Sequence, residues 1–209
     1  MRERPDLHQF RSKVAATALR LLQRNPSAGG QSTAARAVQH LAEQTLARHR
    51  QHREEIACHP GCGDCCQVNV AVLDAETEAV CSYLRQHLSP GEFENLRQAA
   101  HKLHLRVGGL NDQERLLARS PCLFLDKKKR CSIYPVRPLL CRSLTSTDAD
   151  RCREAITMAA LDRSPPVLCH LWQQELFNQA FLGLADALQD AGLEARSRQL
   201  VEAVWQRLQ

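Results

Sequence analysis

The sequence of 209 residues predicts a mainly α-helical protein with a small β-hairpin and a cysteine-rich metal-binding core between helical segments. Three observations lead to this prediction. Apolar residues recur at helical spacing over most of the chain, only short segments alternate as a strand does, and most of the ten cysteines gather in two segments. The chain is long enough to bury a core unaided, so a metal is not needed to compensate for small size.

Residues 1–55 are expected to form an N-terminal helical hairpin. In the first predicted helix, Leu7, Val14 and Leu21 lie on one face. Residues 25–30 are rich in asparagine, proline, serine and glycine, which indicates a loop at the end of this helix. A second helix is expected from about residue 32 to residue 56, so the hairpin leads directly into the first cysteine segment.

Residues 56–153 are expected to form a cysteine-cluster metal-binding domain. After the first cysteines, residues 68–72 alternate as a short strand does, and Asp74 is suited to cap the helix that follows. Ser89 and Glu92 have the spacing of a capping box, with proline at the first helical position. This part of the chain therefore alternates between short irregular segments and helices.

The C-terminal residues 154–209 are expected to add helices that pack on the same domain. Three helical patterns cover residues 148–161, 167–190 and 193–208, and the dipeptide at 165–166, two prolines, separates the first from the second. No internal repeat of fixed period is present in the sequence.

The charge pattern argues against a nucleic-acid partner. The net charge is only +5, charges of both signs alternate along the chain, and nine aromatic residues provide no platform for stacking bases. The single basic run, residues 127–130, lies between two apolar segments, where we expect the solvated tip of a hairpin.

The sequence also predicts no membrane partner and a cytoplasmic location. No stretch approaches the roughly 20 apolar residues of a membrane span, and Arg20 interrupts the apolar run at residues 14–22. Thiols stay reduced in the cytoplasm, which favours metal binding over the disulfides of an exported protein. A protein partner stays open at this point.

Two cysteine-dense segments carry most of the functional information. Thiolates bind zinc and iron–sulfur clusters strongly, and short turns between cysteines hold two sulfurs on one centre. Cys81 is different, because it shares an apolar helical face with Val80 and Leu84 and is therefore expected to pack in the core. The predicted metal ligands from the two segments are Cys58, Cys62, Cys65 and Cys66 in the first, and Cys122, Cys131 and Cys141 in the second.

These segments resemble the YkgJ-type cysteine-cluster family, known as the zinc- or iron-chelating CxxCxxCC domain. The resemblance covers roughly residues 56–153. It implies a metal-binding protein, and the continuation Ser146-x-Asp148-x3-Cys152 implies Cys152 as a further ligand. The matching motifs are Cys62-x2-Cys65-Cys66, Cys122, Cys131-Ser132-Ile133-Tyr134, Arg137-Pro138 and Cys141-Arg142.

The chain departs from the family pattern at its first ligand. Three residues separate Cys58 from Cys62 where the family usually has two, so either Cys58 or His59 can be the first ligand. The spacing Cys58-x3-Cys62-x2-Cys65 is also that of radical S-adenosylmethionine enzymes. We reject that class, because those enzymes place this loop in a series of βα units and this chain has few strands.

The adjacent pair Cys65-Cys66 bears on which metal is bound. Neighbouring residues rarely place both sulfurs on one tetrahedral ion, whereas they can reach two irons of a cluster. The pair therefore favours an iron–sulfur cluster over zinc, and both metals stay open.

The role of the expected centre is open between three classes. A similar cysteine cluster occurs in lysine N-methylases that modify flagellin, so the resemblance allows an iron–sulfur-dependent enzyme of methyl transfer or redox chemistry. The second class is a structural-metal module that presents helices to a protein partner, and the third is an exported disulfide scaffold. Arg137 is expected either to bond loop carbonyls or, together with Arg142, to offset the negative charge of the thiolates.

Overall fold

The computed structural model describes residues 6–49, 56–159 and 166–209. Over these residues the fold is mainly α-helical with one small antiparallel sheet, which confirms the predicted fold class. The elements follow in the order α1 (Leu7–Arg24), α2 (Ala28–Arg48), β1 (Ala71–Val72), α3 (Asp74–His87), α4 (Pro90–Val107), α5 (Asp112–Leu117), the 3-10 helix η2 (Tyr134–Val136), α6 (Leu139–Ser143), α7 (Ala149–Met158), α8 (Leu171–Asp190), β2 (Arg198–Gln199) and α9 (Leu200–Arg207).

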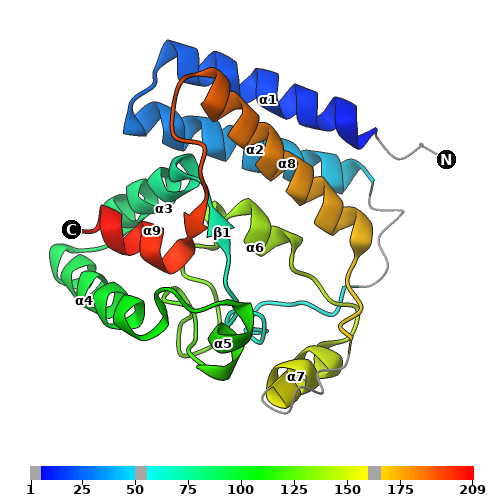
Figure 1. Cartoon of the computed structure of the whole chain (residues 1–209), viewed down its shortest axis with the longest axis vertical. Coiled ribbons are helices and arrows are strands. Elements are labelled where there is room, and N and C mark those ends of the chain that lie inside the picture. Colours follow the sequence, from blue (N-terminus) through cyan, green and yellow to red (C-terminus); the bar gives the residue numbers. More distant parts are fainter. Residues whose placement is uncertain (1–5, 50–55, 160–165) are drawn as a thin grey trace.

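Helices α1, α2 and α8 form one layer at one end of the molecule, with α7 at the opposite end (Figure 1). Val14, Val38 and Leu184 are fully buried in the core that these helices share. The helices α1 and α8 approach closely at Gly183, where a Cβ atom would lie 2.8 Å from the carbonyl oxygen of Arg11. The N-terminal hairpin and a C-terminal helix therefore share one core, while the division into three regions stays a prediction.

A second apolar core lies among α3, α4, α9 and the loop around η2. Val80, Ile133 and Val204 are fully or almost fully buried in it. Asp74 ties the C-terminal elements to the start of α3, because its carboxylate accepts hydrogen bonds from Arg198 at 2.9 Å and Arg207 at 3.3 Å. Asp74 is thus the first residue of α3 and an ion-pair partner, whereas the sequence suggested that it caps the helix.

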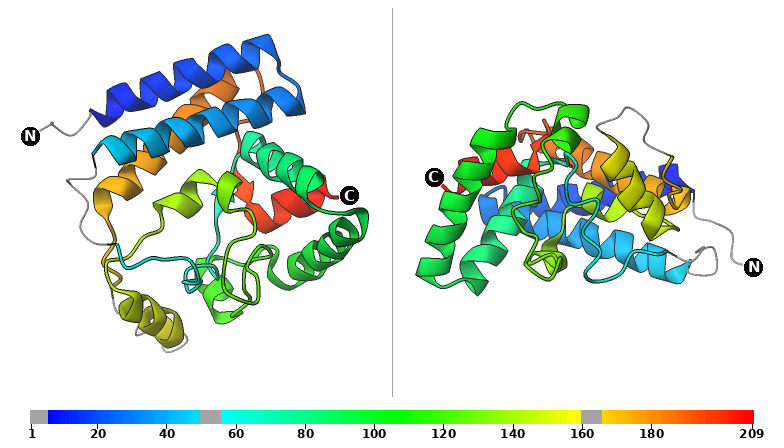
Figure 2. Two further views of the ribbon diagram at one scale, coloured as in Figure 1. Left: turned by 180° about the vertical axis from the view of Figure 1, so that it is seen from behind. Right: turned by 90° about the horizontal axis from the view of Figure 1, so that it is seen from below.

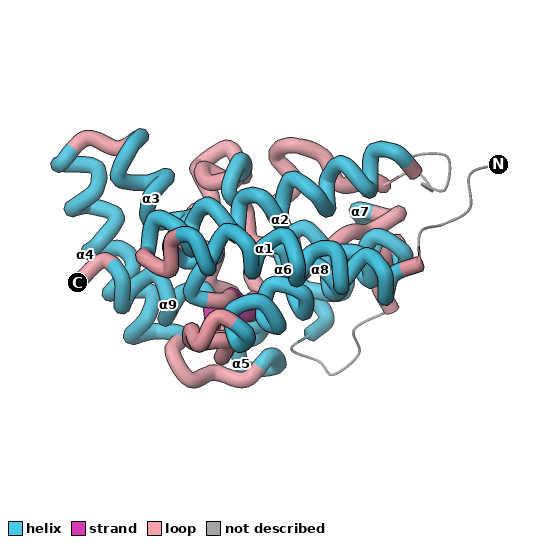
Figure 3. The backbone as a smooth tube through the Cα atoms, turned by 90° about the horizontal axis from the view of Figure 1, so that it is seen from above, coloured by secondary structure: helices cyan, strands magenta, loops and turns pink. Residues whose placement is uncertain are grey.

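The sheet joins segments that are far apart in the sequence. Ala71 pairs with Gln199 and Val72 with Arg198, so β1 and β2 run antiparallel near the middle of the molecule (Figure 3). The tip expected at residues 127–130 is a tight turn closed by a single antiparallel bridge between Leu125 and Cys131. This basic run is exposed, as the sequence predicts.

Helix boundaries agree with the sequence where a local signal marks them. At the start of α4, Glu92 accepts from the backbone N–H of Ser89 at 2.9 Å and its own N–H donates to the Ser89 hydroxyl at 3.4 Å, which confirms the capping box. Helix α2 begins at residue 28, earlier than expected, and Gly30 permits this because a Cβ there would lie 1.7 Å from the Asn25 carbonyl oxygen.

Other boundaries are shorter than the sequence suggested. Helix α9 begins at Leu200, since residues 198–199 pair in the sheet rather than extend the helix predicted from residue 193. The predicted ends at residues 56 and 161 concern segments that include residues outside the described ranges. Across the three described ranges, none of the helices combines the length and the apolar character needed to cross a membrane.

Candidate metal centre

The first cysteine segment is a loop of two consecutive turns. The N–H of Cys62 donates to the carbonyl of His59 at 2.9 Å, and that of Cys66 donates to Gly63 at 3.1 Å. Gly61 has φ +94°, a left-handed conformation that glycine adopts without strain. These turns bring four thiols into a short loop, as the spacing of the cysteines predicts.

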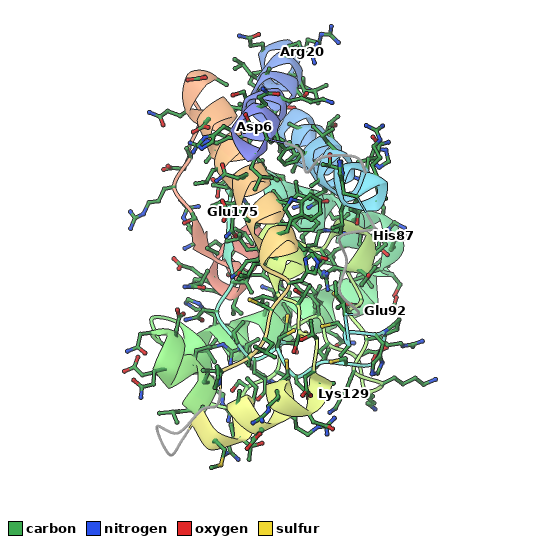
Figure 4. All side chains as sticks on the ribbon, turned by 90° about the vertical axis from the view of Figure 1, so that its right-hand side faces the viewer. Asp6, Arg20, His87, Glu92, Lys129 and Glu175 are labelled. Atoms are coloured by element: carbon green, nitrogen blue, oxygen red, sulfur yellow. The ribbon has the colours of Figure 1, made fainter. Side chains whose placement is uncertain are left out.

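The second cysteine segment lies directly against the first. The backbone N–H of Cys122 donates to the carbonyl of Cys66 at 2.7 Å, a bond between residues 56 positions apart. The two segments, cyan and green, run side by side next to α5 in Figures 1 and 2. Asp64 adds weaker ion pairs to Lys129 at 3.8 Å and Arg153 at 3.9 Å, which link the loop to the basic turn and to α7. Figure 4 shows Lys129 at the end of the molecule remote from Asp6 and Arg20.

One cavity of about 880 Å³ brings the two segments together. Cys152 does not line it, but this residue of α7 interacts electrostatically with Cys58, Cys65 and Cys62. The predicted ligand residues therefore occupy one region of the fold. Those that line the cavity are Cys58, Cys62, Cys65, Cys66, Cys122, Cys131 and Cys141.

Burial disfavours the ionised form of these thiols. It raises the pKa of Cys122 to about 11 and that of Cys141 well above the ordinary value, and it also raises the pKa of Cys131. A hydrogen bond with Cys66, together with burial, raises the pKa of Cys65. Since the thiolate is the form that ligates metals, a positive charge in the cavity is needed to displace these protons.

The two arginines that the sequence singled out have different roles. The charge of Arg137 lowers the pKa of several cysteines, among them Cys131 and Cys141, and its Nε is buried with no hydrogen-bond partner in the described part of the chain. Arg142 instead donates to the carbonyl of Arg137 at 2.6 Å and to that of Tyr134 at 3.3 Å, and it pairs with Glu43 of α2. Arg137 therefore faces the thiols, while Arg142 holds the loop that carries Arg137.

The two candidates for the first ligand differ in their contacts. The Sγ atom of Cys58 accepts a hydrogen bond from the N–H of Ser146 at 3.3 Å, close to Cys152 in the sequence. Both residues are exposed, and the Nδ1 of His59 lies 3.0 Å from the carbonyl oxygen of Pro60. Cys58, rather than His59, therefore has a side-chain contact with the segment that leads to Cys152.

The thiols line one cavity, but they are not arranged around a single point. Among the residues that the structure describes, no three or more histidine, cysteine, aspartate or glutamate side chains are arranged to hold a metal ion. The chemistry of the donors nevertheless fits a thiophilic metal such as zinc or iron, because seven thiols line the cavity and the charge of Arg137 favours the thiolate form of several of them.

Sequence reasoning missed the placement of three charged residues, of which Glu43 and Arg115 line this cavity. Glu43 pairs with Arg142, and Glu76 is fully buried where α3 meets α6. Arg115 is 2 % exposed, lines the cavity, and is the buried residue of α5. A charged residue in a short helix resembles an ordinary solvated one, so the sequence contains no signal for its burial. The core position of Cys81, by contrast, is confirmed by an exposure of 0 %.

The fold and the cavity define a helical protein with a clustered-cysteine site. A family model described as "Putative zinc- or iron-chelating domain", CxxCxxCC, matches residues 57–162, just over half of the chain. The chain belongs to this family. Searches of curated proteins and of solved structures gave no match.

Proposed function

We propose that this protein binds zinc or iron through both cysteine segments at once. The observation that carries the proposal is that thiols from two segments, joined by the bond between Cys122 and Cys66, line one cavity. The description of the family domain as zinc- or iron-chelating supports the same function. The proposed ligands are Cys58, Cys62, Cys65, Cys66, Cys122, Cys131, Cys141 and Cys152.

Within this proposal we favour an iron–sulfur cluster over zinc. The adjacent Cys65 and Cys66 suit two irons of a cluster better than one tetrahedral ion. Seven thiols in one cavity exceed the four ligands of either centre, so the adjacent pair carries this preference. A cluster, when bound, would supply one-electron redox chemistry and a strong cross-link between the segments.

The protein's own residues would prepare the site for such a centre. Arg137 offsets the negative charge of several thiolates, and Arg142 fixes the carbonyls of the loop that positions Arg137. We place Cys58 rather than His59 among the ligands, since Ser146 bonds to its sulfur beside Cys152. The thiols must be reduced for this function, which suits the cytoplasmic location that the sequence predicts.

Anaerobic purification followed by metal analysis and a visible spectrum tests the proposal. A brown protein that contains iron and inorganic sulfide, and whose absorption bleaches on reduction, supports the cluster. A colourless protein with stoichiometric zinc supports metal binding and refutes the cluster. A protein without metal whose cysteines are paired in disulfides refutes the proposed function altogether.

A further inference from the structure

The cavity extends beyond the thiols. Part of its wall is formed by the end of α4, by α5 and by the start of α9, with Val107, Arg115 and Leu200 among the lining residues. Its volume of about 880 Å³ falls within the range of roughly 300 to 1,000 Å³ typical of small-molecule sites. A metal centre held by the cysteines therefore does not account for the whole cavity.

Arg115 places a buried positive charge in this wall. The residue is 2 % exposed, and its Nη1 atom is buried without a hydrogen-bond partner in the described ranges of the chain. A guanidinium stays protonated in proteins, and burying a charge without a counter-charge is costly. Among the cysteines of the described ranges, Cys122 alone interacts electrostatically with Arg115. Arg137, by contrast, interacts with several thiols.

The acidic residues of the cavity wall are engaged elsewhere. Glu43 pairs with Arg142, and Asp126 pairs with Arg130 at 3.0 Å. Glu202 accepts a hydrogen bond from Gln206 at 3.2 Å. The acidic side chains that line the cavity thus have partners of their own, whereas the Nη1 donor of Arg115, a residue of the same wall, has none in the described ranges.

A thiolate sulfur is a weak acceptor and matches a guanidinium poorly. The planar fork of a guanidinium instead fits a carboxylate or phosphate through two parallel hydrogen bonds. We propose that the cavity binds a small organic molecule that bears a carboxylate or phosphate group, with this oxyanion held by Arg115 and the carbon skeleton against the apolar wall. This site goes beyond metal binding and does not depend on which metal the cysteines hold.

The test is calorimetric titration of this chain, purified without oxygen, with inorganic phosphate and with succinate. Sodium chloride at the same ionic strength serves as the reference. We expect saturable binding of at least one probe, weakened at least tenfold by Arg115→Gln. The matched control is Arg119→Gln, which removes an exposed guanidinium that donates to the carbonyl of Thr157, and it should bind as the wild type does.

A second variant covers the case in which Arg115→Gln does not fold. Val201→Glu adds a carboxylate to the cavity wall and should also weaken binding, because its negative charge repels an oxyanion in the same cavity. Metal content is measured on the same samples, so loss of the metal and loss of the anion are told apart. The proposal is overturned if neither probe binds saturably to the wild type, if Arg115→Gln binds equally well, or if Arg115→Gln changes only the metal content.

Discussion

Glu76 joins the second cysteine segment to the core and offers a sharp test of the structure. It is fully buried, and its carboxylate accepts hydrogen bonds from the N–H of Leu73 at 3.2 Å and from the N–H of Leu139 at 2.8 Å. Leu139 begins α6, the helix that carries Cys141. Glu76 therefore helps to position a proposed ligand without being one of the proposed ligands itself.

The environment of Glu76 determines the sign and size of its contribution to the pH dependence of stability. Burial raises the pKa of Glu76 from 4.5 to about 7, although the two N–H groups and Arg142 act in the opposite direction. Between pH 4.5 and about pH 7, Glu76 keeps its proton in the folded protein but has lost it in the unfolded chain. The free energy of unfolding should therefore fall as pH rises through this window, by on the order of 3 kcal/mol at about 1.4 kcal/mol per pKa unit.

Denaturant unfolding of wild type and Glu76→Gln at pH 4.5 and pH 7, with equal metal content, measures this effect. The amide removes the titration, so the stability difference between the two proteins should shift by on the order of 3 kcal/mol in favour of the variant as pH rises. Loss of one acceptor adds a pH-independent cost of about 1 to 3 kcal/mol. Glu154→Gln, at an exposed position of α7, is the control. Parallel pH curves for wild type and Glu76→Gln would refute the burial argument.

Two further predictions concern packing and metal removal. Gly183→Ala should lower the free energy of unfolding by about 1 to 3 kcal/mol in chemical denaturation, because its Cβ would lie 2.8 Å from a carbonyl oxygen of α1. Gly91→Ala enters open space and should cost nothing, so equal losses in both variants would contradict the close approach. A thiolate-bound structural metal can contribute roughly 10 to 16 kcal/mol, so its removal should increase amide exchange across residues 56–153 while the helices outside them stay protected. Unchanged exchange around Cys62 would mean that the metal is not structural.

Local signals explain which parts of the fold were predictable. The apolar stripes of α1 and α8 and the capping box at Ser89 specify helices from neighbouring residues alone. The pairing of Val72 with Arg198 has no such signal, because two-residue strands are determined by the packing of distant segments. For the same reason α9 is shorter than its apolar pattern suggested.

At the candidate site, too, local patterns in the sequence predicted some features and missed the contacts between distant segments. Motif spacing was sufficient to select the cysteines that line the cavity, since each segment carries its own turns. It did not predict that Arg142 would bond loop carbonyls and pair with Glu43 of the N-terminal hairpin, or that Arg115 would be buried. These contacts depend on how α2 and α5 pack against the cysteine segments, and a single sequence does not encode them in any local pattern.

The convergence of both cysteine segments on one metal centre is tested most directly by the metal content of single-cysteine variants. Cys62→Ala removes a thiol of the first segment and Cys131→Ala one of the second, so each should lower the bound metal per chain. Cys81→Ala is the matched control, because Cys81 is buried in the core and its loss should leave the metal in place at a cost of about 1 kcal/mol in stability. Full metal content in either Cys62→Ala or Cys131→Ala would contradict a shared centre.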